Sequence, residues 1–198
     1  MNLLASLGTG AVVGIVVGAV VVFLLIVFLI WYVSTHNKFV TMRNNTEEAF
    51  NTIDVYLKKR YDLIPNLVST VKGYAKHEES VFTKVTEARS KVGTATTAAE
   101  KIEANAQLSQ AMRNFNMVME RYPELKANAN FMDLQQQLKK IETELANQRR
   151  YYNALVRELN RKREVFPSSI VARRMRIEKA TYFELDSAEE RKNVKVEF

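Results

Sequence analysis

The chain has 198 residues, which suits one domain of ordinary size together with an additional segment. It contains no Cys and only two His, and this excludes a zinc site built from these ligand types. The formal net charge is +7, and all of this excess lies after residue 35, because residues 1–35 contain no charged side chain. The composition therefore predicts an uncharged N-terminal segment attached to a basic, water-soluble body.

The first predicted element is a transmembrane helix over residues 10–33. This segment, GAVVGIVVGAVVVFLLIVFLIWYV, has no charged or strongly polar side chain. At about 1.5 Å per residue such a helix is roughly 36 Å long, enough to cross a hydrocarbon core with some tilt. Its length and the absence of Lys, Arg and a small-residue cleavage site favour an uncleaved anchor over a signal peptide. Trp31 and Tyr32 fit an aromatic belt at its end.

The cations nearest to this helix lie on its C-terminal side, beginning with Lys38 and Arg43. Since cytoplasmic loops are enriched in Lys and Arg, this asymmetry places residues 1–9 outside the cytoplasm and the large domain inside it. We therefore expect a single-pass protein in that orientation.

Three glycines recur every four residues in the membrane segment and share one stripe of the helix: Gly10, Gly14 and Gly18. Such a stripe lets two helix backbones approach closely and is a known packing face in membranes. Glycine is common in membrane helices in any case, so the stripe is also compatible with a monomer. We predict that the chain forms a homo-oligomer through this face.

A long helix over residues 36–72 follows. Its apolar residues keep a three-to-four spacing that places them on one helix face: Phe39, Met42, Phe50, Ile53, Leu57, Ile64, Leu67 and Val71. Pro65 removes one backbone hydrogen bond and crowds the preceding turn, so we expect a bend there, with the helix continuing beyond it. Gly73 and the polar sequence AKHEE indicate a turn over residues 73–76.

Two shorter helices are predicted next. The first spans residues 77–92, with Gly93 as a left-handed cap. The second opens at Thr97, which forms a capping box with Glu100, and extends to about residue 122. The positions predicted to be buried are Val81, Phe82, Val85 and Ala88 in the first helix, and Ile102, Ala106, Met112, Phe115 and Met119 in the second.

The last long helix covers residues 130–166, with Asn130 as its N-cap and Phe166–Pro167 at its end. Its apolar side chains alternate steps of three and four, as antiparallel bundle helices require: Phe131, Leu134, Leu138, Ile141, Leu145, Tyr152, Leu155 and Leu159. We therefore expect an all-α fold, an antiparallel up-and-down four-helix bundle over residues 34–166 after the membrane helix. The last helix would bring the tail, residues 167–198, back to the bilayer surface.

No pattern in the sequence indicates catalysis. His36 and His77 have no Cys partner and do not fit the Glu-x-x-His pattern of a di-iron bundle, and no Gly-rich phosphate loop is present. We expect no catalytic residue, no cofactor and no metal, and we interpret His77 as a polar residue at a helix start. Lys58 lies one turn from Asp54 and from Asp62, a spacing that predicts ion pairs in preference to acid–base chemistry.

Positive charge is concentrated in residues 157–179, where eight Lys or Arg and three Glu give +5 of the total +7. We predict a basic amphipathic helix here, whose candidate contacts with anionic lipid are Arg173, Arg174, Arg176 and Lys179. Two alternatives stay open: a merely solvated face and, less favoured beside a membrane, a contact with nucleic acid. Residues 181–198 are expected to form a flexible terminus, with strand addition to a partner as the alternative.

Several motifs occur in order along the chain: RYDLIPNLVSTVKGYAKHE, YPELKANANF, YYNALVRELN, FPSSIVA and YFE. They resemble the bacterial LemA proteins over about residues 36–185, which implies a membrane-anchored four-helix bundle in the bacterial cytoplasmic membrane and no settled biochemical activity. Some relatives act in forming magnetosome membranes, which points to membrane organisation. The sequence IVARRMRIEKA departs from the family, whose members commonly have an apolar, Gly-containing stretch there. The motif residues expected to shape the bundle are Asp54, Arg60, Tyr61, Asp62, Pro65, Asn66, Gly73, Tyr74, His77 and Glu78.

These features together predict a membrane-anchored scaffold that self-assembles and organises the membrane or its associated proteins, without chemistry of its own. The alternative is an adaptor or regulator of another membrane protein, such as a membrane protease. The expected partners are the lipid bilayer, further copies of the chain and, in the alternative, a membrane protein.

Overall fold

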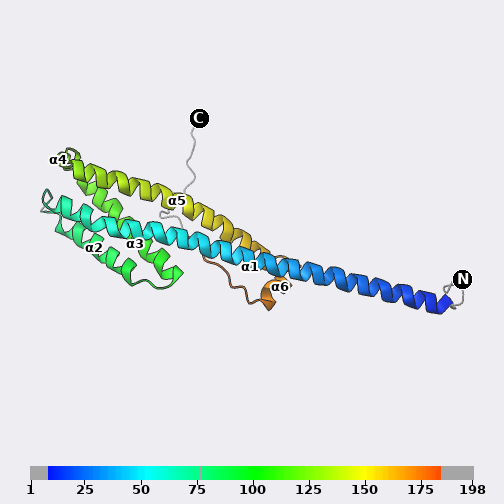
Figure 1. The fold of residues 1–198 in the computed structure, drawn as a ribbon. Coiled ribbons are helices and arrows are strands. Elements are labelled where there is room, and N and C mark those ends of the chain that lie inside the picture. The colour runs from blue at the N-terminus through cyan, green and yellow to red at the C-terminus, as the bar shows by residue number, and fades with distance from the viewer. Residues whose placement is uncertain (1–8, 76, 184–198) are drawn as a thin grey trace, which may run out of the picture. The chain divides into compact units, whose positions relative to one another are not determined.

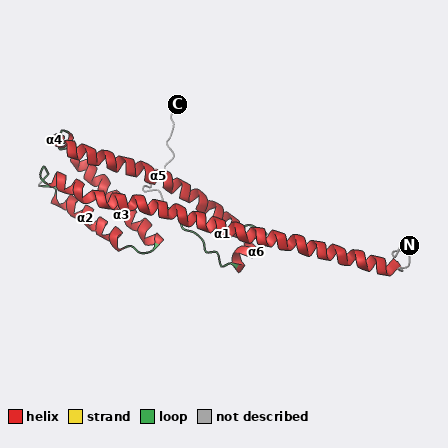
Figure 2. Cartoon of the chain, in the orientation of Figure 1, coloured by secondary structure: helices red, strands yellow, loops and turns green. Residues whose placement is uncertain are grey.

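Helices account for most of the described chain. A computed structural model describes residues 9–75 and 77–183 (Figure 1). In chain order the helices are α1 (Thr9–Lys72), α2 (Glu79–Thr94), α3 (Ala98–Met119), α4 (Pro123–Lys126), α5 (Ala129–Glu164) and α6 (Ser168–Arg174). The described residues contain no strand (Figure 2), and the predicted all-α class is confirmed.

The chain divides into two compact units that do not follow the order of the sequence. Unit 1 comprises Met1–Asn45 and Glu158–Lys179, and unit 2 comprises Thr46–Arg157 and Ala180–Phe198. Helices α1 and α5 contribute residues to both units. Each unit therefore combines segments that are distant in sequence.

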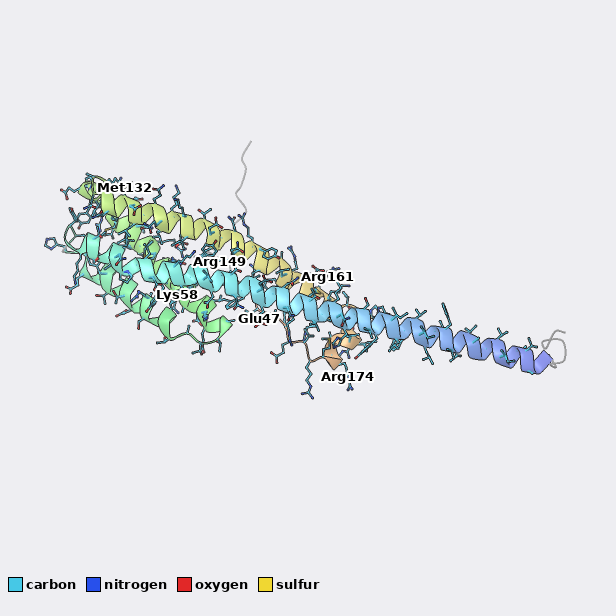
Figure 3. All side chains as sticks on the ribbon, in the orientation of Figure 1. Glu47, Lys58, Met132, Arg149, Arg161 and Arg174 are labelled. Carbon is cyan, nitrogen blue, oxygen red and sulfur yellow. The ribbon has the colours of Figure 1, made fainter. Side chains whose placement is uncertain are left out.

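Unit 1 contains the predicted membrane helix. Among the described residues, one helix is long and apolar enough to cross a membrane, and its apolar part starts at Gly10. Side chains from residue 11 to residue 30 are exposed (Figure 3), as expected for a surface that lipid covers. A Cβ added at Gly10, Gly14 or Gly18 would meet no atom of the chain within 4 Å. The glycine stripe is therefore open to a partner, and its role in packing stays a prediction.

Unit 2 buries its apolar side chains in two clusters. The first cluster draws on α1 to α5, and its fully buried members are Leu67, Val71, Val85, Leu108, Phe115 and Leu125. The second draws on α1, α3, α5 and the segment after α6, and its fully buried members are Ile53, Leu145 and Val156. The predicted helical segments overlap α1, α2, α3 and α5, and α4 and α6 are additional short helices, so the helical bundle is present and its count of four helices stays a prediction.

The end of α1 agrees with the sequence-based prediction. Helix α1 continues through Pro65 to Lys72, and the turn follows at Gly73. Helix α2 begins at Glu79, two residues later than expected, so His77 is an exposed turn residue and not the start of a helix.

The prediction that Gly93 is a left-handed cap is wrong. Helix α2 continues through Gly93 to Thr94, and no described glycine has a positive φ. A Cβ at residue 93 would lie 3.1 Å from the Tyr61 hydroxyl oxygen, so a larger residue here would require the Tyr61 side chain to shift by a few tenths of an ångström.

The predicted capping box of α3 is confirmed. The N–H of Glu100 donates to the Thr97 hydroxyl oxygen at 3.2 Å, and the N–H of Thr97 donates to the Glu100 carboxylate at 3.1 Å. The expected burial of Ala106 is wrong, because the buried face of α3 passes through Asn105 and Ser109 instead.

Helix α3 also ends at Met119, earlier than expected, and Pro123 opens α4 as its first residue. The expected cap of α5 is displaced by two residues. The side-chain oxygen of Asn128, and not of Asn130, accepts the N–H of Phe131 at 3.0 Å.

The expectation of a flexible terminus is wrong for residues 181–183. The Tyr152 hydroxyl donates to the carbonyl oxygen of Thr181 at 2.9 Å. The Asn153 amide binds the backbone of Phe183 twice, as donor at 2.7 Å and as acceptor at 2.8 Å. Phe183 is buried in the second cluster, so a tertiary contact and not local periodicity fixes this segment. Residues 184–198, with the VKVEF sequence, lie outside the described residues.

Candidate functional site

The apolar part of α1 and the connection between α5 and α6 meet in unit 1 (Figure 1). A cavity of about 140 Å³ lies between them, and the residues that line it are Trp31, Thr35, Lys38, Phe39, Met42, Lys162, Val165, Phe166, Pro167 and Ser168. Trp31, the predicted aromatic-belt residue, thus lines the same cavity as the Phe-Pro motif that follows α5. The sequence predicted both features but not their proximity.

Hydrogen bonds at the end of α5 fix this connection. The single O–H of Ser168 is shared between two carbonyl oxygens, that of Lys162 at 2.7 Å and that of Val165 at 3.0 Å. The N–H of Ser169 donates to the Val165 carbonyl at 2.9 Å. These bonds supply partners to carbonyl groups that a helix C-terminus leaves unsatisfied. Phe166 lies in the resulting tight turn with 82% of its surface exposed.

The predicted basic amphipathic helix is only partly present. Helix α6 ends at Arg174, and Arg176 has a φ of 52°, a left-handed conformation that interrupts an α-helix. The Arg163 side chain donates to the carbonyl oxygen of Ile177 at 2.9 Å and ties the segment after α6 to α5. Val171 is fully buried, so α6 uses one face for packing within the chain.

The four candidate lipid contacts lie on the surface of unit 1 although they do not share one helix: Arg173, Arg174, Arg176 and Lys179. In Figure 3 the Arg174 side chain extends away from α1. By sequence, unit 1 has nine Lys and Arg and three Glu, a net charge of +6, which leaves +1 for unit 2. The net positive charge of the chain is therefore concentrated in the unit that contains the apolar helix.

Unit 2 contains a buried arginine that the sequence analysis did not predict to be buried. Arg60 exposes only 1% of its surface. In the chain it comes three residues after Leu57, the last α1 residue of the second apolar cluster. Its Nε lies 2.9 Å from the Glu142 carboxylate, and its Nη1 donates to the Ser109 hydroxyl at 2.9 Å. Arg60 is three residues after Leu57 and four before Ile64, so the helical spacing of these buried residues was the signal that could have located it.

Pro65 and Tyr61 form a second unexpected arrangement. Proline has no N–H, so the carbonyl of Tyr61, four residues earlier in α1, has no donor within the helix. Arg89 of α2 donates its Nε–H to this oxygen at 3.0 Å, and its guanidinium lies 3.8 Å from the centre of the Tyr61 ring. The proline thus creates an acceptor that binds α2 to α1.

Two acidic motif residues of α1 form ion pairs. Asp54 pairs with Lys101 of α3 at 2.8 Å instead of with Lys58. The other predicted pair, Lys58 with Asp62, is present at 3.2 Å between exposed side chains.

Two more motif residues hold the turn after α1 to the connections on either side of α4. Glu78 accepts hydrogen bonds from Arg121 at 2.9 Å and from the Tyr122 hydroxyl at 3.2 Å. The Tyr74 hydroxyl accepts a hydrogen bond from the Asn128 amide at 3.0 Å. The carbonyl of Asn66, within α1, accepts two side-chain hydroxyl groups, at 2.9 Å and 2.8 Å. These bonds give the motif residues structural roles in unit 2.

The perturbed titratable groups belong to structural positions. In residues 9–75 and 77–183 no group of three or more His, Cys, Asp or Glu is arranged to hold a metal ion. Hydrogen bonds from the Thr97 and Thr96 N–H groups lower the pKa of Glu100 to about 2, and this carboxylate is part of a helix cap. Burial raises the pKa of Tyr152, whose hydroxyl holds the segment after α6.

The fold defines a helical-bundle protein with one N-terminal apolar helix that could serve as a membrane anchor. The model of the LemA family matches residues 49–198. The chain therefore belongs to the LemA family, as its motifs predicted. It is also similar to Protein LemA of Metamycoplasma hominis, with 23% identity over 164 residues that cover 82% of this chain and 75% of that protein.

Proposed function

We propose that this protein is a membrane-anchored scaffold that self-assembles, organises the membrane or its associated proteins and performs no chemistry of its own. One observation carries the proposal. Helix α1 runs without interruption from Thr9 to Lys72, so no turn or linker separates the apolar segment from the residues that form the core of unit 2. An association of apolar segments within the membrane would therefore bring the folded domains of several copies together.

The exposed glycine stripe supports the self-assembly part of the proposal. Backbones can approach closely where side chains are absent, and Gly10, Gly14 and Gly18 meet no atom of their own chain on this side. Lipid tails are as apolar as the surrounding Val and Leu side chains, so close backbone packing supplies the attraction between helices in a bilayer.

We place the protein in the bacterial cytoplasmic membrane as a single-pass protein, with its N-terminus outside and the bundle in the cytoplasm. The support is the charge distribution, since every Lys and Arg follows the apolar segment in the chain. Protease digestion of intact and lysed cells tests this orientation. Digestion of the bundle from outside intact cells would show that the orientation is reversed.

Substitution of Gly14 tests the scaffold. We expect Gly14→Ile to reduce cross-linked dimers of the full-length protein in membranes by about fivefold, because the new side chain separates the helix backbones. Val16→Ile is the matched control, since a residue two positions away lies on the opposite side of the helix. An unaltered cross-linking pattern in Gly14→Ile would reject assembly through this face.

Purification of the full-length protein in a mild detergent separates the scaffold from the adaptor alternative. Particles that contain mainly this chain are expected. A stoichiometric complex with one unrelated membrane protein would instead favour an adaptor or regulator.

A further inference from the structure

We propose that the turn between α5 and α6 is a second membrane anchor, which inserts Val165, Phe166 and Ile170 among the lipid headgroups next to Trp31. We call these three residues the apolar elbow. The inference deepens the proposed membrane anchoring and rests on α1 crossing the bilayer, but it does not depend on self-assembly.

The exposure of the apolar elbow is the first observation. Phe166 exposes 82% of its surface, Ile170 51% and Val165 42%. Their neighbours Val171 and Ala172 are buried, so α6 packs one apolar face against the chain and leaves the other without cover. Three adjacent apolar side chains on a surface, one of them an aromatic ring, indicate an interaction site more strongly than a single exposed residue does.

The position of the elbow identifies lipid as the occupant. Val165 and Phe166 line the same cavity as Trp31, which lies at the end of the apolar segment of α1. Trp residues at the end of a membrane helix lie at the level of the headgroups, because their rings are apolar and their N–H is polar. The α1 residues that line this cavity extend from Trp31 to Met42, about three helical turns, so the elbow lies beside the end of the apolar segment where the headgroups are expected.

The charges around the elbow fit the same occupant. Arg161, Lys162 and Arg163 precede it together with one acidic residue, Glu164, and Arg173 and Arg174 follow it, while no Asp or Glu lies between Val165 and Arg174. Apolar side chains flanked by Lys and Arg are typical of segments that lie in the interface of anionic membranes. A purely apolar protein partner would leave these cations without opposite charges, whereas an anionic membrane surface pairs with them and also receives the apolar side chains.

The elbow is also fixed before it meets a membrane. The Ser168 hydroxyl closes the end of α5, and the Arg163 side chain holds the carbonyl of Ile177. A preorganised apolar tip loses little conformational entropy when it inserts, which favours binding by few residues.

A fluorescent reporter in the full-length protein tests the inference. Trp31 is the only Trp of the chain, so Phe166→Trp in a Trp31→Phe background places a single indole at the elbow. The protein is reconstituted into vesicles of phosphatidylcholine and phosphatidylglycerol, with bromine on the acyl chains near the headgroups. Met117→Trp in the same background is the control, because Met117 has a comparable exposure of 64% on α3.

We expect brominated lipid to quench the emission at residue 166 by about half and aqueous iodide to quench it weakly, as for an interfacial side chain. At residue 117 we expect the reverse. Emission at residue 166 that iodide quenches and brominated lipid does not would overturn the inference. Blue-shifted emission that neither agent quenches would also overturn it, since the ring would then lie against protein, such as a second copy of the chain.

A second variant removes the apolar group. Phe166→Ser alters a side chain that makes little contact with the fold. In vesicles we expect amide exchange of residues 165–174 to increase about tenfold in this variant. Exchange in unit 2, for example in residues 102–115, should stay unchanged and serves as the internal control. Equal exchange in both proteins would count against insertion. Quenching at residue 166 together with unaltered cross-linking in Gly14→Ile would retain the elbow and reject self-assembly through the glycine stripe.

Discussion

The two units use apolar side chains in opposite ways. Unit 2 places them in two buried clusters and carries a net charge of +1, whereas unit 1 leaves them exposed along α1 and at the apolar elbow and carries +6. In water, burial of apolar surface is the main force that folds a domain. In a bilayer the lipid covers this surface, so an apolar side chain can stay exposed without loss. The same residue type therefore stabilises the fold in one unit and, in the proposed function, selects the membrane as the environment of the other.

The largest expected effect compares the same substitution in both units. Leu67 is fully buried in the first cluster of unit 2, whereas Leu25 exposes 61% of its surface in unit 1. We expect Leu67→Ala to lower the free energy of unfolding by about 3 kcal/mol, because it leaves a cavity. Leu25→Ala should change it by less than about 0.5 kcal/mol. Urea unfolding of both full-length variants in detergent measures the difference, and equal losses would contradict the comparison.

A smaller effect tests how Pro65 is accommodated in unit 2. We expect Arg89→Ala to lower the free energy of unfolding by about 1 kcal/mol, since the Tyr61 carbonyl then loses its donor. In a Pro65→Ala background the N–H of residue 65 can bind this carbonyl, so Arg89→Ala should have a smaller effect there. A double-mutant cycle measures this coupling. The exposed Lys58–Asp62 pair is a control, and Lys58→Ala should have almost no effect. Additive losses in the cycle would show that Arg89 does not replace the missing donor.

Local sequence rules predicted α1, α2, α3 and α5 and two helix ends, the end of α1 and the start of α3. The three-to-four spacing located α1 and α5, and the Thr97–Glu100 pair located the start of α3, because each of these signals acts within one or two helical turns. The errors have tertiary causes. Gly93 lies against the Tyr61 side chain, and Phe183 is fixed by the Asn153 side chain.

The candidate site was predictable only in part for the same reason. The cations near the site, and Trp31 at the end of the apolar segment, can be recognised from the sequence. The exposure of Phe166 cannot be predicted, because an apolar residue at a helix end is expected to be buried and a short turn has no periodicity. The hydrogen bonds of Ser168, which hold Phe166 outward, connect residues only three to six positions apart, but they depend on how α5 ends. Arg60 shows the converse case, in which a charged residue occupies a position of the buried face.

The capping box gives unit 2 a pH-dependent contribution. The folded protein holds the pKa of Glu100 at about 2, below its ordinary value of 4.5, and the unfolded chain binds the proton at higher pH. The stabilisation is therefore complete above the ordinary pKa and is lost as the pH falls toward the folded value. We expect Glu100→Gln to show a shallower decline of stability across this range. Urea unfolding as a function of pH measures it, and parallel declines in both proteins would contradict the assignment.

The smallest effect on stability is expected in unit 1, where the cations are exposed. Replacement of Arg173, Arg174 and Arg176 by Gln should change the free energy of unfolding by less than about 0.5 kcal/mol. It should nevertheless reduce the protection of residues 168–177 from amide exchange in vesicles with anionic lipid, since each cation near such a surface contributes about 1 kcal/mol of attraction. A control with the same loss of charge replaces three exposed lysines of unit 2: Lys126, Lys139 and Lys140. Protection of residues 168–177 that responds to neither lipid charge nor salt would mean that water, and not lipid, surrounds these arginines.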